Sequence, residues 1–232
     1  MWSLEQWKRG ECELMDEGSQ CVVLACEAAE GEAVLDMCAG NGGKALALAA
    51  LVGDSGSLLA HDVVESRLAA LRASAERASV SERITTVLTG GEGLEQACDR
   101  RFDLVLVDAP CSSSGTLRRH PGLRWGGLWT RAHGVEERER LVALQRSLLK
   151  RALSMTRPGG RLVYATCSLD HEENERVADA FAGSAIGAEC EPWPFADGVA
   201  GRHDRAPHYR TLWPHRHGTD GFFIARWRVP IE

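Results

Sequence analysis

The sequence predicts an α/β fold built on a doubly wound, mostly parallel sheet. From about residue 32 onward, short β-type runs alternate with helical ones, which is the pattern of βαβ units. The chain has 232 residues, 44% of them hydrophobic and 26% charged, so it can form one compact domain with a sizeable core. No internal repeat, low-complexity tract or linker-like shift of composition divides it.

Seven segments are expected to form the sheet, because each is a short apolar or β-type run bounded by turn signals. In chain order they are Ala33–Cys38, Ser57–Asp62, Arg83–Leu88, Phe102–Asp108, Arg161–Thr166 and a late pair near Ala185–Cys190 and Gly221–Trp227. Ligands of an open parallel sheet bind beyond the carboxyl ends of its strands, so the residues that follow these strands should converge in one cleft.

Apolar residues at helical spacing predict the connecting helices at 19–30, 45–52, 63–79 and 135–156. The first of these is expected to be a covering helix in front of the first strand, and the Arg-Pro-Gly-Gly run at 157–160 ends the last. Farther on, Asp170 and Glu173 have the spacing of a helix-capping box, and we prefer this structural interpretation of the acidic run to a catalytic one. Such a helix terminus could also lower the pKa of the Cys167 thiol.

The formal net charge of −6 argues against a protein that coats nucleic acid by neutralising phosphates. Basic residues nevertheless gather in two regions. Residues 118–131 carry four arginines and no acid, and residues 201–228 carry six arginines and four histidines against two acids. Two interpretations stay open, a solvated face and a local nucleic-acid footprint.

The remaining bulk features narrow the class of protein. No uncharged stretch approaches a membrane span and the amino end lacks the apolar segment of a secretory signal, so we expect a cytoplasmic protein without membrane contact, with an organellar or nucleolar location left open. The eight cysteines include no C-x-x-C pair, which favours reduced thiols over a zinc ribbon, a redox dithiol or a disulfide framework. The histidines after residue 200 are irregularly spaced, and no metal site is expected.

A glycine-rich turn, DMCAGNGGK from Asp36 to Lys44, joins the first strand to a helix. Its glycines let the backbone approach a ligand and leave N–H groups at a helix amino terminus. The turn matches neither the dinucleotide fingerprint nor the phosphate loop, and a plain connecting turn is the alternative. At the next strand end, Asp62 could accept hydrogen bonds from ribose hydroxyls or cap the following helix. The combination suggests a nucleoside-type cofactor.

Two cysteines follow strands in equivalent ways, Cys111 after LVLVDAP and Cys167 after GGRLVYAT. A cysteine is often only a small core side chain. Two of them at neighbouring strand exits, each flanked by hydroxyl residues, favour thiol chemistry. We treat the other six as structural or incidental, except Cys38, which should line the cofactor loop.

Four stretches, DMCAGNGGK, DAPCSSSGTLRRHP, YATCSLDHEENE and DGFFIARW, resemble in order and spacing the motifs of the Nol/Nop/Sun family of RNA (cytosine-5)-methyltransferases, which includes the bacterial RsmB-like enzymes. DEGSQ at 16–20 resembles that family's lead-in to the catalytic domain. The resemblance implies a seven-stranded, Rossmann-like sheet of the class I S-adenosylmethionine-dependent type with a late antiparallel strand. Residues 1–30 would be a lead-in with a covering helix, and residues 31–232 the methyltransferase domain.

The resemblance further implies S-adenosylmethionine as methyl donor and a cytosine of ribosomal or transfer RNA as acceptor. Cys167 would add to C6 of the cytosine, Cys111 would assist release, and Asp108 would hydrogen-bond the base edge. The implied cofactor residues are Cys38, Ala39, Gly40, Asn41, Gly42, Gly43, Lys44, Asp62, Arg67 and Asp108.

The basic loops are our candidates for contact with RNA. Residues expected to hold phosphates are Arg118, Arg119, His120 and Arg124, and the aromatics Trp125, Trp129 and Tyr209 either stack on bases or belong to the core. Because the chain is acidic overall, targeting could depend on a ribonucleoprotein or ribosomal partner. The alternative function is a noncatalytic RNA-binding or ribosome-assembly factor, and the presence of both thiols and Asp108 favours the enzyme.

Overall fold

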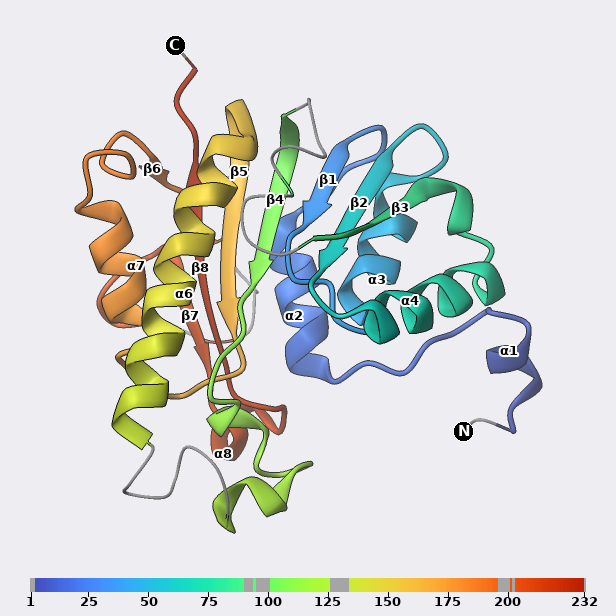
Figure 1. Cartoon of the computed structure of the whole chain (residues 1–232), viewed down its shortest axis with the longest axis horizontal. Coiled ribbons are helices and arrows are strands. Elements are labelled where there is room, and N and C mark those ends of the chain that lie inside the picture. The colour runs from blue at the N-terminus through green and yellow to red at the C-terminus, as the bar shows by residue number, and fades with distance from the viewer. Residues whose placement is uncertain are drawn as a thin grey trace.

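The computed structural model describes residues 3–89, 94, 101–125, 134–195, 201 and 203–231. An eight-stranded sheet runs through the middle in the order β3-β2-β1-β4-β5-β8-β6, with β7 paired to β8. Helices cover both faces of this sheet (Figure 1). The doubly wound α/β fold that the sequence predicts is confirmed.

Five strands are mutually parallel. Four of them lie close to their predicted bounds, namely β1 (Ala33–Asp36), β2 (Ser57–Asp62), β3 (Ile84–Leu88) and β4 (Phe102–Asp108). The fifth is β5 (Thr156–Thr166). The middle of β4, residues 104–107, is apolar because alternate side chains enter two different cores. The strand order reverses between β1 and β4, which is where an open sheet of this kind forms its ligand crevice.

Antiparallel strands complete one edge of the sheet. β8 (Phe222–Arg228) runs against β5, and both β6 (Glu191–Pro192) and β7 (Tyr209–Leu212) run against β8. The strand expected at Ala185–Cys190 is wrong, because the backbone N–H groups of Gly187 and Ala188 bond back to the Ser184 carbonyl and fold this stretch into turns.

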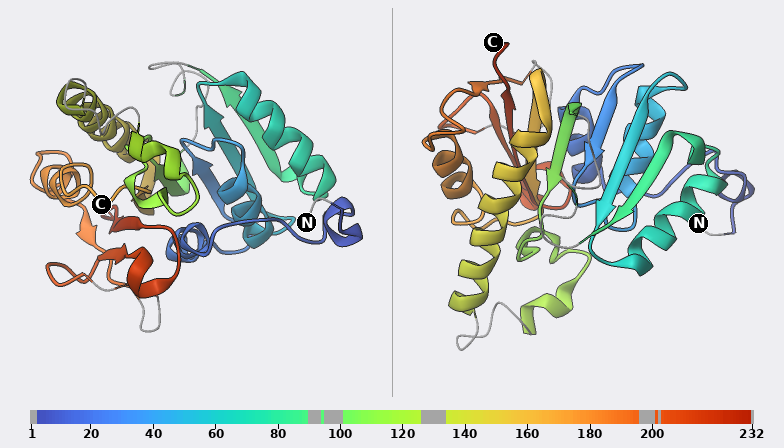
Figure 2. Two further views of the ribbon diagram at one scale, coloured as in Figure 1. Left: turned by 90° about the horizontal axis from the view of Figure 1, so that it is seen from below. Right: turned by 45° about the horizontal axis from the view of Figure 1, so that its top comes forward.

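The helices form two layers. One layer contains α2 (Glu17–Cys26), α3 (Gly43–Val52) and α4 (Glu65–Arg77), and the other contains α6 (Gly134–Met155) and α7 (Glu175–Ala182). Two short helices, α1 (Glu5–Lys8) and α8 (Pro214–His217), lie outside these layers. Figure 2 shows α2 and α6 on opposite sides of the sheet.

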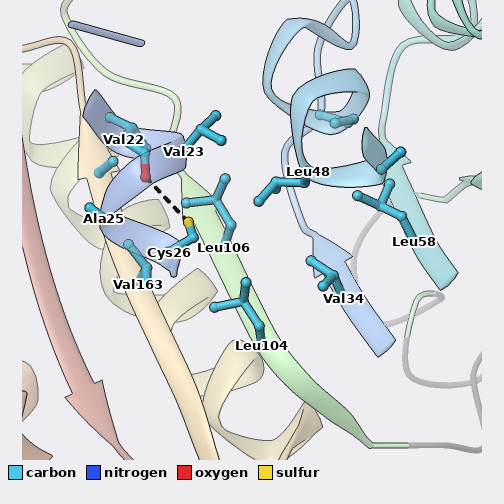
Figure 3. Packing of buried hydrophobic residues seen from close by; sticks show 14 of the residues in the cluster. Val22, Val23, Ala25, Cys26, Val34, Leu48, Leu58, Leu104, Leu106 and Val163 are labelled. Atoms are coloured by element: carbon cyan, nitrogen blue, oxygen red, sulfur yellow. Dashed lines mark hydrogen bonds between the residues drawn. The ribbon is translucent and has the colours of Figure 1, made fainter. Parts of the chain in front are cut away.

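Figure 3 shows α2 lying over β4: Val22 and Val23 of this helix belong to the same buried cluster as Leu104 and Leu106 of β4. Burial of such aliphatic side chains stabilises the fold by about 1.5–3 kcal/mol each.

The carboxyl ends of β4 and β5 meet at the lower edge of the sheet in Figure 1, beside the start of β8. Among the described residues, no helix combines the length and the apolar composition needed to cross a membrane.

Candidate active site

β4 and β5 deliver two cysteine thiols to the same point of the sheet edge. The strands are paired in register up to Asp108 and Ala165, so the loops that carry Cys111 and Cys167 leave side by side. The two Sγ atoms lie 3.4 Å apart, and both residues are partly exposed. The convergence predicted from the two strand exits is confirmed.

The environment of the two sulfurs makes them unequal. The hydrogen bond that they share, with a further one to the Ser113 hydroxyl and the nearby Lys44 cation, lowers the pKa of the Cys167 thiol despite its burial. The same shared hydrogen bond and burial raise the pKa of the Cys111 thiol. Cys167 is therefore the thiol that ionises first. The expected helix terminus is not among these causes, because α7 begins only at Glu175.

Lys44 and Asp108 form an ion pair next to the thiols. Lys44 stands in the first turn of α3 and Asp108 ends β4, and the Nζ to Oδ2 distance is 2.6 Å. Burial works against the charge of Lys44, but the carboxylates of Asp108 and Asp36 outweigh it and raise the pKa of the ammonium group. A permanent cation thus lies beside Asp108 and within electrostatic reach of Cys167.

A cavity of about 370 Å³ opens between the glycine-rich turn and the lead-in segment. Seven of the ten predicted cofactor residues line it, namely Cys38, Ala39, Gly40, Asn41, Gly43, Lys44 and Asp108. Gly42 faces away: its φ of +92° is in the left-handed region, and a Cβ there would lie 2.5 Å from Cγ of Leu71 on α4. The lead-in contributes Leu14, Met15, Asp16 and Ser19, which the sequence did not indicate.

Asp62 holds the glycine-rich turn by a hydrogen bond to its backbone and is not among the lining residues of this cavity. Its carboxylate accepts the N–H groups of Gly40 at 3.0 Å and Val64 at 2.9 Å, and Arg67 Nη1 lies 3.6 Å away. α4 begins at Glu65 without a side-chain cap, so Asp62 orders the turn before the helix and does not cap the helix itself. A ribose contact by Asp62 stays a prediction.

Glu173 contacts the cysteine loops and does not cap a helix, contrary to the prediction from the sequence. The capping-box interpretation is wrong, because Asn174 precedes the first residue of α7 and the Asp170 carboxylate only accepts the Glu172 N–H within a turn. The Glu173 side chain is fully buried and points to the cysteine loops, where it accepts hydrogen bonds from Ser112, Ser168 and Gln145. The spacing of acids along the chain gave no signal for these contacts.

Comparison with known proteins decides the family. The sequence family described as 16S rRNA methyltransferase RsmB/F matches residues 23–228. The chain belongs to this family. It is 31% identical over 226 residues to the probable ribosomal RNA small subunit methyltransferase B of Bacillus subtilis, covering 96% of this chain and 48% of that protein. It is 34% identical over 199 residues to the ribosomal RNA small subunit methyltransferase F of Erwinia tasmaniensis, covering 84% and 40%.

A solved structure agrees with the RsmB/F assignment. NSun6 from Pyrococcus horikoshii, determined with SFG, superimposes with a TM-score of 0.83 at 25% identity and covers 98% of this chain and 56% of its own. The chain therefore spans about half the length of the curated relatives that it matches. The cofactor of this family and fold is S-adenosylmethionine.

The cavity of this RsmB/F chain fits such a cofactor. Asp36, for which the sequence carries no functional signal, is fully buried in the cavity wall, and neither carboxylate oxygen has a hydrogen-bond partner of good geometry among the described residues. Burial and the neighbouring Asp108 carboxylate raise the pKa of Asp36 to about 7. An unsatisfied acid at this depth suits a cationic ligand, and S-adenosylmethionine carries a sulfonium and an ammonium group.

The arginines predicted to hold RNA are divided between two settings. Arg118 reaches the buried Asp16 at 2.8 Å and Arg119 the buried Asp220 at 2.5 Å, so both tie the loop after β4 to the starts of α2 and β8. His120 and Arg124 are exposed.

Among the aromatics expected either to stack on bases or to belong to the core, Trp125 is 82% exposed. Tyr209 is buried in the core and its hydroxyl donates to Asp179, so of the two alternatives the core position holds for Tyr209. Trp129 and Arg131 lie outside the described residues.

Proposed function

We propose that this chain is an S-adenosylmethionine-dependent methyltransferase that modifies C5 of a cytosine in RNA, and specifically in ribosomal RNA. The observation that carries the proposal is the pair of partly exposed thiols, 3.4 Å apart, beside the Lys44 and Asp108 ion pair. One sulfur alone is common in protein interiors. Two sulfurs with opposite pKa shifts in one opening suit a reaction that needs a nucleophile and a second polar group.

Cys167 is the proposed nucleophile. C5 of cytosine is a poor nucleophile, and the Cys167 thiolate makes it a better one by forming a carbon–sulfur bond to C6. The lowered pKa of Cys167 supports this role, since the thiolate and not the thiol attacks. S-adenosylmethionine supplies the methyl group from its sulfonium. The base has to be splayed out of any stack, because attack at C6 and transfer to C5 need access to the ring.

Cys111 is proposed to assist the second half of the reaction. Once C5 carries the methyl group, a solvent water accepts the C5 proton, the electron pair of that C–H bond re-forms the C5–C6 double bond, and the bond between C6 and the Cys167 sulfur breaks, which returns the thiolate. The raised pKa keeps Cys111 protonated while Cys167 is the thiolate. The neutral thiol is close enough to share a proton with the leaving sulfur.

Asp108 is proposed to hold the edge of the cytosine. Its Oδ2 is engaged by Lys44, and the described residues offer no hydrogen-bond partner to Oδ1. That second oxygen can accept a hydrogen bond from the ring nitrogen of a protonated cytosine, which favours the electrophilic form of the base. Lys44 keeps Asp108 oriented and offsets its repulsion of the Cys167 thiolate.

Adduct trapping tests the proposal. With RNA and S-adenosylmethionine present, Cys111→Ala should accumulate protein joined to RNA, visible as a shifted band under denaturing conditions. Cys167→Ala should give neither adduct nor methylated RNA. The exposed Cys12→Ala serves as the matched control and should behave as wild type. Methylation by the Cys167→Ala variant would show that the thiol roles are misassigned.

The partners follow from the same proposal. RNA is the substrate, the cytoplasm is the proposed location, and a ribonucleoprotein partner could supply targeting. Absence of measurable S-adenosylmethionine binding by the purified chain would instead favour the noncatalytic assembly factor, which shares the fold but needs no methyl donor.

A further inference from the structure

We propose that the Glu173 carboxylate sets the separation of the Cys111 and Cys167 thiols and is thus a positioning residue for both. The inference deepens the proposed function and rests on it for its catalytic meaning. No hydrogen bond joins Glu173 to either sulfur; it acts through the residue that directly follows each cysteine.

One carboxylate holds both cysteine loops. Oε2 of Glu173 accepts the backbone N–H of Ser112 at 2.9 Å, and Oε1 accepts the hydroxyl of Ser168 at 2.8 Å. The hydroxyls of Ser112 and Ser168 lie a further 2.9 Å from each other. Because the two oxygens of a carboxylate are a fixed distance apart, the two loops are tied to a single rigid group.

Gln145 anchors this clamp to α6. Its Nε2 donates to Oε2 of Glu173 and to the carbonyl of Pro110, both at 3.0 Å, and Pro110 directly precedes Cys111. Gln145 and Glu173 are both fully buried. Three hydrogen-bond donors satisfy the Glu173 carboxylate, and no cation among the described residues contacts it. Loss of any one of these hydrogen bonds would therefore leave a buried charge poorly compensated.

The sheet alone does not fix the sulfurs. Regular pairing of β4 with β5 reaches Asp108 and Ala165, and the N–H of Ala109 still bonds to the Ala165 carbonyl. Beyond that point the backbone of Gly115 holds the carbonyl of Cys167, and the Glu173 clamp holds the residues next to both sulfurs. A small shift of either loop would change the 3.4 Å separation directly.

Two substitutions break the clamp in different ways. Glu173→Gln keeps the length but not both acceptors: with its oxygen toward the N–H groups of Ser112 and Gln145, its NH2 group replaces the acceptor of the Ser168 hydroxyl. Glu173→Asp keeps both acceptors but is one methylene too short to reach both loops together. Glu172→Gln is the matched control. Glu172 is the next residue along the chain, and its carboxylate is half exposed and lies 3.5 Å from Arg176 on the surface.

The rate at which diamide oxidises the two thiols to a disulfide depends on their separation, and this measurement needs neither RNA nor cofactor. The two thiols lose two electrons and two protons as the sulfur–sulfur bond forms, and diamide is reduced to the hydrazine. A disulfide needs the sulfurs to approach in a specific geometry, so we expect both Glu173 variants to close this bond at least about tenfold more slowly than wild type. Glu172→Gln should match wild type. Thermal melting and near-ultraviolet circular dichroism of each reduced variant establish that it is folded.

An unchanged closure rate in folded Glu173→Gln and Glu173→Asp would overturn the inference. Should Glu173→Gln fail to fold, Glu173→Asp and Ser168→Ala carry the same comparison, because each leaves part of the clamp in place. Methyl transfer is measured separately, with a reduced kcat and unchanged cofactor affinity expected. Slower closure in a chain whose wild type methylates no RNA would refute the proposed function and leave the positioning role intact.

Discussion

Nζ of Lys44 lies 2.6 Å from Oδ2 of Asp108, although 64 positions separate the two residues in the chain. The pair joins the glycine-rich turn after β1 to the end of β4, and both side chains line the cofactor cavity. Asp36 and Cys167 both respond to the Lys44 charge. This ion pair therefore couples the electrostatics of the cavity to those of the nucleophile.

Removal of the Lys44 charge should destabilise the fold. Lys44→Met leaves the carboxylates of Asp36 and Asp108 facing each other, and we expect the free energy of unfolding in urea to fall by about 2 kcal/mol. Lys8→Met is the matched control: its ion pair with Glu5 is exposed, and such pairs contribute less than about 1 kcal/mol. Equal effects of the two substitutions would contradict a structural role for the Lys44 pair.

Asp36 should make stability depend on pH. Burial raises its folded pKa to about 7 from a value near 3.9 in the unfolded chain. Between these values the folded state binds more protons than the unfolded state, so this group lowers the free energy of unfolding as pH rises from about 4 to 7.

Asp36→Asn removes the titrating group, so its stability relative to wild type should increase across that window and level off above it. Urea unfolding at a series of pH values measures the difference. Asp54→Asn, at an exposed carboxylate, should instead run parallel to wild type. Parallel curves for Asp36→Asn would exclude the raised pKa.

Thiol alkylation should distinguish the two sulfurs. Iodoacetamide at neutral pH is expected to modify Cys167 before Cys111, because the pKa of Cys167 is lowered and that of Cys111 is raised. Peptide mass spectrometry over time identifies the order. In Cys111→Ala, the pH profile for Cys167 should move to higher pH, since the main hydrogen bond that lowers its pKa is lost. Earlier modification of Cys111 would reverse the proposed roles.

Substitution of two arginines after β4 should distinguish a residue that binds RNA from one that stabilises the fold. Arg124 is exposed and has no ion pair among the described residues, so Arg124→Ala should weaken RNA binding, reduce the salt slope by about 1, and leave stability within about 0.5 kcal/mol. Arg119→Ala should lower stability by about 1 to 3 kcal/mol, because the buried Asp220 loses its charged donor. Salt titrations of RNA binding and urea unfolding measure both effects. A stability loss in Arg124→Ala alone would contradict this division.

The amino-acid pattern by itself determined the parallel part of the fold. The strand bounds Ser57–Asp62 and Phe102–Asp108 match the structure, because local apolar periodicity reports burial in a sheet. The convergence of Cys111 and Cys167 followed from the same reasoning, since neighbouring parallel strands end at one edge. The late strand expected at Gly221–Trp227 is β8 within one residue, whereas the one expected at Ala185–Cys190 did not form, because the pairing of a two-residue strand such as β6 is decided by β8.

Tertiary structure decided which polar groups serve the site. Glu173 has the local spacing of a helix cap, yet its carboxylate is bound by Ser112, which is 61 positions away in the chain. Arg118 belongs to a basic run, yet it pairs with Asp16 over 102 positions. A buried polar group takes the partners that the folded chain brings to it, because leaving it unsatisfied costs more than any local preference contributes. Local pattern therefore specified the sheet and the two thiols, and long-range polar satisfaction specified how those thiols are held.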